Sequence, residues 1–348
     1  MNDSQKSLKI EENVPLAPLT TLKIGGAARF FVRAENEREV AEAFKFANQH
    51  GFELFVLGGG SNVLIADEGF DGLVLQIALK GIEARENIVT ARAGEDWDEF
   101  CEFCVARDLA GIECLSGIPG FVGGTPVQNV GAYGQEVSET ILAVRVFDRK
   151  SGEILELTNA DCRFSYRTSI FNSTDKNRFI VLAVTFKLIK NGAPKIVYKD
   201  LREFFARSEP GLSETRAAVR NIRAEKAMLV RQAGADANSA GSFFKNPVVS
   251  FAKFSEITDR FGIENVPNFK ADEQSVKIPA AWLIEQSGFH KGYTRGNAGL
   301  STRHTLALTN RGGASAKEIL ALKAEIQAKV KEKFGIELTP EPVFVGFD

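Results

Sequence analysis

The segment that most constrains this chain is an uncharged run of 22 residues, from Cys114 to Gln135, with six glycines and two prolines. Its length is that of a membrane span, but Pro119, Pro126 and so many glycines cannot maintain a hydrogen-bonded helix in lipid. Glycine backbone can instead approach a large ligand, because it reaches positive φ and has no side chain. Apolar residues such as Phe121 and Val122 favour an ordered segment. A loop this long and ordered is typical of a functional site.

A second glycine-rich segment, LGGGSNVLIAD at 57–67, follows a short apolar stretch at 54–57. One interpretation is a pyrophosphate cradle, built from backbone N–H groups of the glycines and side-chain donors of Ser61 and Asn62. An ordinary tight turn is the alternative. The pattern is not G-x-G-x-x-G, which disfavours a Rossmann site. Two such loops without a lysine predict one extended, anionic, aromatic-bearing cofactor rather than ATP.

Chain length and net charge limit the number of domains and the kinds of ligand to be expected. A chain of 348 residues exceeds the usual size of one core, so two or three domains are expected. A net charge of -2 gives no electrostatic footprint for nucleic acid or an anionic membrane. The first residues, MNDSQKSLKIEENVP, lack the apolar core of a secretory signal. We therefore expect a cytosolic protein.

The four cysteines do not make a disulfide framework in a chain this long. Cys101 and Cys104 form a C-x-x-C pair, but Asp96 with Glu99 reads as a capping box that opens a helix around them. A zinc site would need two more close ligands, and the chain has three histidines with no evident motif. We predict buried structural thiols and no metal.

The remaining pattern predicts an α+β fold. Asn36 with Glu39 opens a helix that ends before Gly51, and Ser315 precedes a terminal helix that reaches Phe334. Short apolar runs predict strands at 29–34, 82–85, 88–94 and 179–188 and hairpins that turn at 86–87 and 151–152. From residue 212 the sequence pattern changes to that of a helix rich in basic residues, and this change predicts the start of a second domain.

Five motifs in order along the chain carry a family resemblance: LGGGSNVLIAD, SGIPGFVGGTPVQNVGAYG, FSYRTSIF at 164–171, AGSFFKNP at 240–247 and TPEPVFVG at 339–346. Together they resemble the UDP-N-acetylenolpyruvoylglucosamine reductase family. The resemblance implies an α+β protein with a FAD-binding domain of the vanillyl-alcohol-oxidase (PCMH) type in two subdomains, at 15–190. It further implies a connecting segment with a substrate loop at 191–211 and a C-terminal α+β substrate-binding domain at 212–348.

The resemblance also implies a reaction. NADPH reduces a noncovalent FAD, and the flavin then reduces UDP-N-acetylglucosamine enolpyruvate to UDP-N-acetylmuramate in bacterial peptidoglycan synthesis. Neither nucleic acid nor membrane insertion is implied. The implied FAD-binding residues are Gly58, Gly59, Gly60, Ser61, Asn62, Ser116, Gly117, Gly123, Gly124, Asn129, Gly131 and Ala132.

The catalytic residues carried over from the family are Arg167, Ser242 and Glu341. An enol ether accepts hydride poorly unless its carboxylate is polarised, and Arg167 supplies a planar cation suited to a carboxylate. Glu341 keeps the second carboxylate of the family's Leu-Glu-Pro-Glu, although Thr339 replaces the first. Ser242 is the expected proton donor, since an enolate-like carbon is basic enough to take a proton from a neutral hydroxyl. Without the family, these would read as a structural arginine, a capping serine and a solvated glutamate.

The implied substrate contacts are Tyr166, Tyr198, Lys226, Lys245 and Asn246. Lysine and asparagine donors suit the diphosphate of a sugar nucleotide. The resemblance places Tyr198 on a mobile loop that closes over the nucleotide. Without the family, Tyr198 would read as a hydrophobic anchor at a strand end.

Two other functions stay open at this point. A flavin oxidase of the same superfamily is one, but neither glycine segment contains a histidine for covalent attachment, and Cys114 has no recognisable attachment motif. A non-catalytic protein that binds a nucleotide sugar is the other. Pure binding does not require Arg167, Ser242 and Glu341 together, which favours the enzyme.

Overall fold

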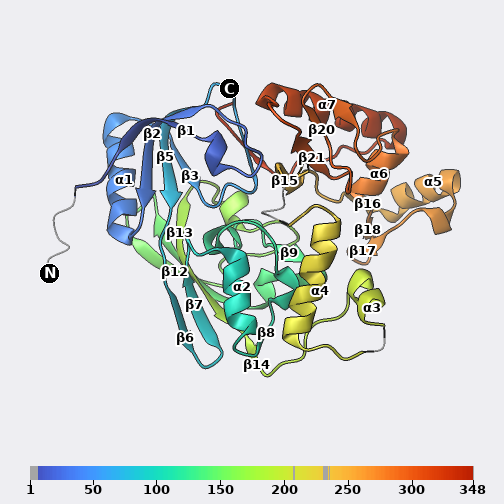
Figure 1. Ribbon diagram of the computed structural model, residues 1–348, viewed down its shortest axis with the longest axis horizontal. Helices are drawn as coiled ribbons and strands as arrows, with labels where there is room; N and C mark the ends of the chain where they lie inside the picture. The colour runs from blue at the N-terminus through green and yellow to red at the C-terminus, as the bar shows by residue number, and fades with distance from the viewer. Residues whose placement is uncertain (1–6, 207, 230–233, 235, 348) are drawn as a thin grey trace.

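The computed structural model describes residues 7–206, 208–229, 234 and 236–347. Figure 1 shows two sheets of the N-terminal half on one side of the molecule, α2 and α4 beside them, and the C-terminal elements at the opposite upper corner. Among the residues described, no helix combines the length and the apolar character that crossing a bilayer requires.

The first sheet has the strand order β1-β2-β5-β3, with three parallel strands and an antiparallel edge strand. Helix α1 packs on it and is bounded as predicted, because the Asn36 side chain accepts from the amide of Glu39 and Gly51 ends it at φ 68°. The elements are β1 (Glu11–Pro15), β2 (Ala27–Ala34), α1 (Glu37–His50), β3 (Leu54–Leu57) and β5 (Phe70–Ile77).

The second sheet is antiparallel, in the order β12-β11-β13-β7-β6, and contains both predicted hairpins. Trp97, Phe100 and Phe186 are fully buried between it and α2. The two C-x-x-C cysteines lie in α2 as free buried thiols, as predicted. The elements are β6 (Ile82–Arg85), β7 (Ile88–Arg92), α2 (Trp97–Val105), β11 (Ile141–Asp148), β12 (Ile154–Thr158) and β13 (Phe179–Lys187).

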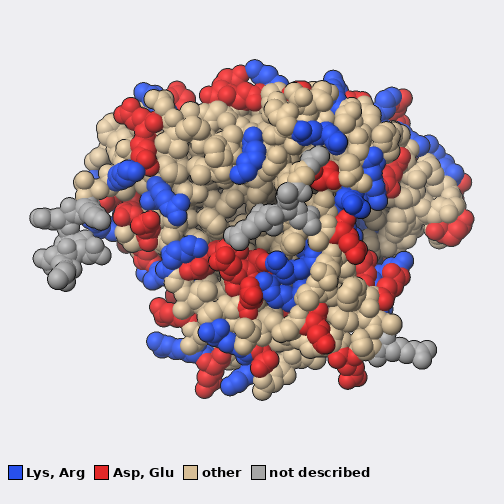
Figure 2. All heavy atoms as spheres, viewed as in Figure 1, with Lys and Arg blue, Asp and Glu red and all other residues tan. Residues whose placement is uncertain are grey.

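Short elements join these layers to α4. Helix α4 spans Leu212–Glu225, a little short of the predicted basic run, and it packs against α2 and η2. Asp98 on α2 forms ion pairs with Arg216 and Arg220 on α4. Figure 2 shows acidic and basic side chains lying next to one another on the face that carries these helices. The short elements are β4 (Val63–Ile65), β8 (Leu109–Ala110), β9 (Gly131–Ala132), β10 (Gln135–Glu136), β14 (Ile189–Lys190), α3 (Lys199–Phe205), η1 (Ala17–Leu19), η2 (Glu113–Leu115), η3 (Val122–Gly124), η4 (Val137–Glu139) and η5 (Ile170–Asn172).

The C-terminal half has its own apolar core, but Leu22, Ile24 and Leu64 from the N-terminal half also enter it. The last strand, β22, returns to pair in parallel with β4, which lies within the first glycine-rich segment. The division of the chain at residue 212 stays a prediction. The elements are β15 (Ser239–Ser242), β16 (Val248–Ser250), α5 (Phe251–Phe261), η6 (Ile263–Asn265), β17 (Phe269–Lys270), β18 (Ser275–Lys277), α6 (Ala280–Gln286), β19 (Thr294–Arg295), β20 (Ala298–Leu300), β21 (Ala307–Asn310), α7 (Ala316–Phe334) and β22 (Val343–Val345).

Candidate active site

The two glycine segments lie against each other. A Cβ atom on Gly59 would stand 2.8 Å from the Cα of Gly120, so only glycine permits this approach. Ser61 Oγ donates to the carbonyl of Pro119 at 3.0 Å, and Asn62 Nδ2 donates to Gln128 Oε1 at 2.8 Å. The residues in these two hydrogen bonds are separated by 58 and 66 positions along the chain. Two stretches that are distant in sequence therefore make one backbone-rich surface.

Neighbouring glycines of the first segment face different surroundings. Gly60 has φ 65°, and a Cβ there would collide with the carbonyl of Leu19, so this glycine is required by the chain itself. Nothing lies within 4 Å of a Cβ on Gly58 or Gly124, and both line one cavity of about 220 Å³. Apolar side chains such as Phe55 and Ile180 form its walls. Bare backbone beside an apolar cavity fits a flavin dinucleotide.

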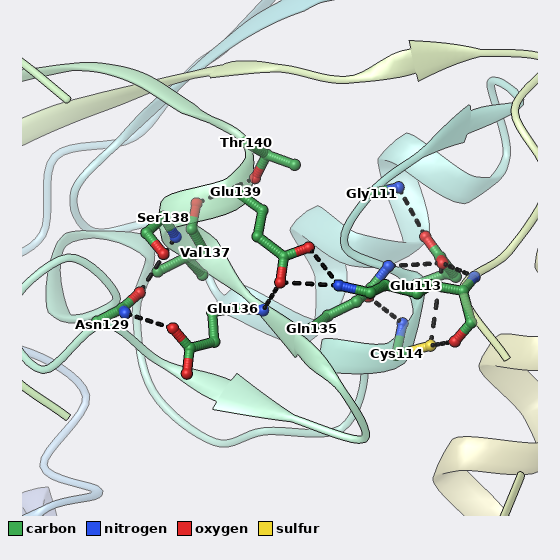
Figure 3. A network of polar contacts seen from close by, with 11 residues as sticks. Gly111, Glu113, Cys114, Asn129, Gln135, Glu136, Val137, Ser138, Glu139 and Thr140 are labelled. Atoms are coloured by element: carbon green, nitrogen blue, oxygen red, sulfur yellow. Dashed lines mark hydrogen bonds and ion pairs between the residues drawn. The ribbon is translucent and has the colours of Figure 1, made fainter. Parts of the chain in front are cut away.

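The second glycine segment is closed at its ends by a buried carboxylate. Gln135 Nε2 donates to Glu113 Oε1 at 2.7 Å, while the amide of Cys114 donates to Gln135 Oε1 at 2.8 Å. Figure 3 shows this network and, beside it, Asn129 donating to Glu136 Oε2 at 2.7 Å. These contacts explain how a 22-residue uncharged segment remains ordered.

The other predicted FAD-binding residues of this segment are built into the protein. Gly117 donates its amide to Asp98 at 2.7 Å and accepts from Arg223 Nε at 3.0 Å, and Ser116 is fully buried. Gly123 packs against Ala93 on one side and also lines the same cavity as Gly58 and Gly124. Ala132 pairs with Gln135 in a short hairpin. The side-chain amide of Asn129 donates to Glu136 Oε2 and to the carbonyl of Ser165. Their contacts with a flavin stay a prediction.

Arg167 and Glu341 form an ion pair, with Arg167 Nε 3.5 Å from Glu341 Oε1. Arg167 sits in a tight turn at φ 52°, and its Nη2 donates to the carbonyl of Gly131 at 2.8 Å. Its Nε is buried and makes no hydrogen bond with the described residues. The guanidinium is thus fixed by the second glycine segment and still has a donor to offer.

Glu341 is held from both halves of the chain. Its amide donates to the carbonyl of Phe243 at 2.9 Å, and its carbonyl accepts from Asn62 Nδ2 at 3.2 Å. Burial raises the pKa of Glu341 above its ordinary value of 4.5, while Arg167 and Lys245 act in the opposite direction. This carboxyl group takes a proton more readily than an exposed glutamate does.

Ser242 ends strand β15, where it pairs with Ala307 on β21. The next residue, Phe243, is fully buried and its carbonyl is the one that binds the amide of Glu341. The segments that carry Ser242 and Glu341 therefore lie side by side, and Glu341 is paired with Arg167. The role of the three residues in catalysis stays a prediction.

Comparisons with known proteins agree with this geometry. Residues 28–158 match a FAD binding domain, and residues 232–345 match the C-terminal domain of UDP-N-acetylenolpyruvoylglucosamine reductase. The reductase of Thermobifida fusca is 44% identical, over 96% of this chain and 97% of its own. That of Streptomyces coelicolor is 46% identical, over 96% of this chain and 90% of its own. The chain belongs to the UDP-N-acetylenolpyruvoylglucosamine reductase family.

A solved member of the reductase family has the same fold. The enzyme of Thermus caldophilus aligns with a TM-score of 0.66 at 25% identity, over 97% of this chain and all of its own. The predicted α+β fold with a FAD-binding domain and a reductase C-terminal domain is confirmed.

Sequence reasoning missed one lysine of this reductase site. Lys277 ends β18, and its Nζ lies 3.6 Å from the ring centre of Tyr166, next to Arg167. Burial lowers the pKa of Lys277, with Glu136 opposing this effect. The signal in the sequence was a lysine between the apolar residues Val276 and Ile278.

Lys245 and Asn246 lie near the pair. Lys245 Nζ donates to the carbonyl of Arg167 at 3.5 Å. Asn246 uses its side-chain oxygen to accept from the amide of Ala280 at 2.9 Å, at the start of α6. Lys245 thus adds positive charge beside Glu341, whereas the side chain of Asn246 fixes a neighbouring helix.

Tyr198 and Lys226 form a second group, at the edge of the second glycine segment. The ring of Tyr198 meets that of Tyr133 edge-on, with centres 5.5 Å apart. Lys226 Nζ is 2.5 Å from Asp200 Oδ2 and lies over the Tyr133 ring. Tyr198 precedes α3, not the strand end of the alternative interpretation.

His304 has a lowered pKa mainly because it is shielded from solvent, and two nearby lysines add to the effect. Burial, and then Lys226 and Lys291, lower the pKa of His304 from 6.5 to about 4. A neutral imidazole among cations marks a place where an anion would be stabilised. This is the kind of environment that the diphosphate of a sugar nucleotide requires.

Proposed function

We propose that this protein uses NADPH and FAD to reduce UDP-N-acetylglucosamine enolpyruvate to UDP-N-acetylmuramate. The observation that carries the proposal is the Arg167–Glu341 pair, which is half-buried and tied through Asn62 to both glycine segments. A charge-stabilising pair beside a flavin-binding surface is what reduction of an enol ether needs. We propose the cytoplasm as the compartment, because NADPH and nucleotide sugars are found there.

The glycine segments provide the support for FAD. Gly58 and Gly124 expose bare backbone to the cavity, and Phe55 and Ile180 give it apolar walls. When bound, FAD supplies a two-electron carrier that takes hydride from NADPH and passes it to the olefin. We propose noncovalent binding, since the Cys114 thiol is buried and donates to the carbonyl of Lys195.

Arg167 would polarise the carboxylate of the enolpyruvyl group. Its Nε, which is ion-paired with Glu341 but makes no hydrogen bond with the described residues, and its fixed guanidinium suit one carboxylate oxygen. The delocalised cation stabilises negative charge that spreads into that carboxylate. Glu341, whose pKa burial raises, would complete the group as a hydrogen-bonding carboxyl. Together they lower the energy of the enolate-like transition state.

Ser242 would deliver the proton to the α-carbon. Hydride arrives at one carbon of the olefin, and the proton from Ser242 Oγ completes the reduction at the other. A neutral hydroxyl is a sufficient acid because the enolate carbon is strongly basic, and it keeps its proton until that charge develops. The hydroxyl then regains a proton from solvent.

Lys226, with Tyr198, would hold the diphosphate. In this structure Lys226 pairs with Asp200, so binding of the nucleotide exchanges one anionic partner for another. Lys245 and Lys277 extend the positive charge toward Arg167. We propose that the sugar nucleotide spans these two groups of residues.

An anaerobic titration tests the proposal. The purified protein should be yellow, NADPH should bleach it, and UDP-N-acetylglucosamine enolpyruvate should restore the oxidised spectrum. A colourless protein would favour a nucleotide-sugar binding protein. Flavin that reoxidises with oxygen but not with the enolpyruvyl substrate would favour an oxidase.

A further inference from the structure

Glu113 is a fully buried carboxylate that the proposed chemistry does not use. Three N–H groups donate to it: the amide of Gly111 at 2.7 Å, Gln135 Nε2 at 2.7 Å and the amide of Lys195 at 3.0 Å. The thiol of the neighbouring Cys114 adds a longer contact, with Sγ 3.9 Å from Oε1. Figure 3 shows the Gly111 and Gln135 contacts converging on this side chain. A buried carboxylate needs several such donors, and here all three come from different segments.

One oxygen of Glu113 joins two of these segments. Oε1 accepts both from Gln135, at the end of the second glycine segment, and from Lys195, which begins a short segment that ends at Tyr198. The side chain of Lys195 points elsewhere, to a surface ion pair with Glu139 at 2.7 Å. The link from Glu113 to this segment is therefore a backbone contact.

Residues 195–198 continue along the glycine segment after that contact. A Cβ on Gly134 would stand 2.5 Å from Val197 Cγ2, which shows how closely the two stretches pack. Tyr198 then meets Tyr133 edge-on, with planes at 85°. Glu113 fixes the first residue of this stretch, and the position of Tyr198 follows from it.

We propose that Glu113 is a positioning residue for Tyr198. It fixes the start of the 195–198 segment to the glycine segment, so that Tyr198 is presented to the nucleotide in a set position relative to the flavin surface. The inference rests on the proposed function, since it concerns how that substrate is held. Glu113 itself touches neither substrate nor cofactor.

Exchanging the two side chains tests this idea. In the double variant Glu113→Gln/Gln135→Glu, the new amide donates to the new carboxylate and the glycine segment stays closed. That orientation turns an N–H group toward the amide of Lys195, so this contact is lost. We expect FAD content and the rate of flavin reduction at saturating NADPH to stay unchanged. The KM for the UDP-sugar should rise about 3- to 10-fold, the scale of one lost hydrogen bond.

Lys195→Ala is the matched control. It removes the ion pair with Glu139 but keeps the backbone donor, so its KM should equal that of the wild type. Lys195→Pro removes the donor together with the side chain and also restricts φ here and the backbone of Pro194. Compared with Lys195→Ala, which lacks the same side chain, it should reproduce the rise in KM even if the double variant does not fold. An unchanged KM in Lys195→Pro, or in a folded double variant, overturns the proposal.

Failure of the proposed function would look different. A wild-type protein that turns over no UDP-sugar would refute the proposed function. The positioning role of Glu113 would then be tested by amide hydrogen exchange, which needs no substrate. Faster exchange over residues 196–200 in Lys195→Pro than in Lys195→Ala then supports positioning by Glu113. Equal exchange in the two variants overturns it.

Discussion

The glycine surface and the Arg167–Glu341 pair are adjacent but built by opposite means. The surface consists of backbone, and its shape depends on the absence of side chains at Gly59 and Gly60. The pair, Arg167 and Glu341, consists of charged side chains whose burial gives them their chemistry. Substitutions on the surface should therefore act on folding and FAD binding, whereas substitutions around the pair should act on turnover.

Ser242→Ala should have the largest effect and should separate the two regions most cleanly. Flavin reduction by NADPH needs no proton from Ser242, so its rate should stay near that of the wild type. Reoxidation by the enolpyruvyl substrate should slow by ~10²- to 10⁴-fold, or about 3 to 5 kcal/mol. Stopped-flow spectroscopy measures both half-reactions. Equal losses in both would assign Ser242 to the flavin site or the fold.

Gly60→Val should unfold part of the glycine surface. The added side chain would collide with the carbonyl of Leu19, and a β-branched residue at φ 65° is strained. We expect a loss of about 2 to 4 kcal/mol of stability and of FAD binding together. Thermal unfolding and flavin content after gel filtration measure these. A stable, fully flavinated variant would contradict the packing seen here.

Gly58→Val is the sharper test of the cofactor surface. A Cβ at this position meets no protein atom within 4 Å, so the apoprotein should keep its Tm. The side chain would intrude on the cavity, and FAD affinity should fall about 10- to 100-fold, as expected for 1 to 3 kcal/mol of crowding. Fluorescence titration of the apoprotein with FAD measures it. Unchanged affinity would place the cofactor elsewhere.

Lys226→Ala should change substrate binding only. Loss of one phosphate partner should raise the KM for the UDP-sugar about 10-fold and leave flavin reduction at saturating NADPH intact. Steady-state and half-reaction kinetics on the same preparation separate these effects. If KM stays constant, the pair with Asp200 is the whole role of this lysine.

Glu341→Gln should change stability only slightly, and the sign of its pH dependence should show whether the pKa of Glu341 is raised in the folded protein. Because the folded-state pKa of Glu341 is raised, wild-type stability from this residue is fully present below pH 4.5 and is lost as pH rises through the folded pKa. The glutamine variant, which mimics the neutral acid, should gain Tm relative to the wild type as pH rises above 4.5. Calorimetry from pH 4 to 8 tests this, and a constant difference would contradict burial as the dominant cause.

The sequence predicted the local elements well because their signals are local. Asn36 with Glu39, and Ser315 before the terminal helix, give cap geometries that the structure shows, and the turns at 86–87 and 151–152 join paired strands. Each signal involves residues within a few positions of one another. The motifs likewise predicted the family, which the comparisons confirm.

The contacts that assemble the site were not predictable from the sequence. Nothing local indicated that Gln135 would bind Glu113 or that Asn62 would join Gln128 and Glu341. The predicted role of Asn62 in binding the cofactor stays a prediction. Lys277 carried only the weak signal of a lysine in an apolar strand. Hydrogen bonds between residues separated by as many as 279 positions depend on how sheets and cores pack, and no local pattern encodes that.

By itself, the sequence determined the capped helices α1, α2 and α7, the two hairpins and the two glycine segments, because capping, periodicity and glycine content act over short distances. Tertiary structure decided which glycines serve the fold and which face the cavity, since that depends on what stands opposite each one. It also decided the proton affinity of Glu341, because burial and the nearby Arg167 arise only when the last residues of the chain return to the first glycine segment.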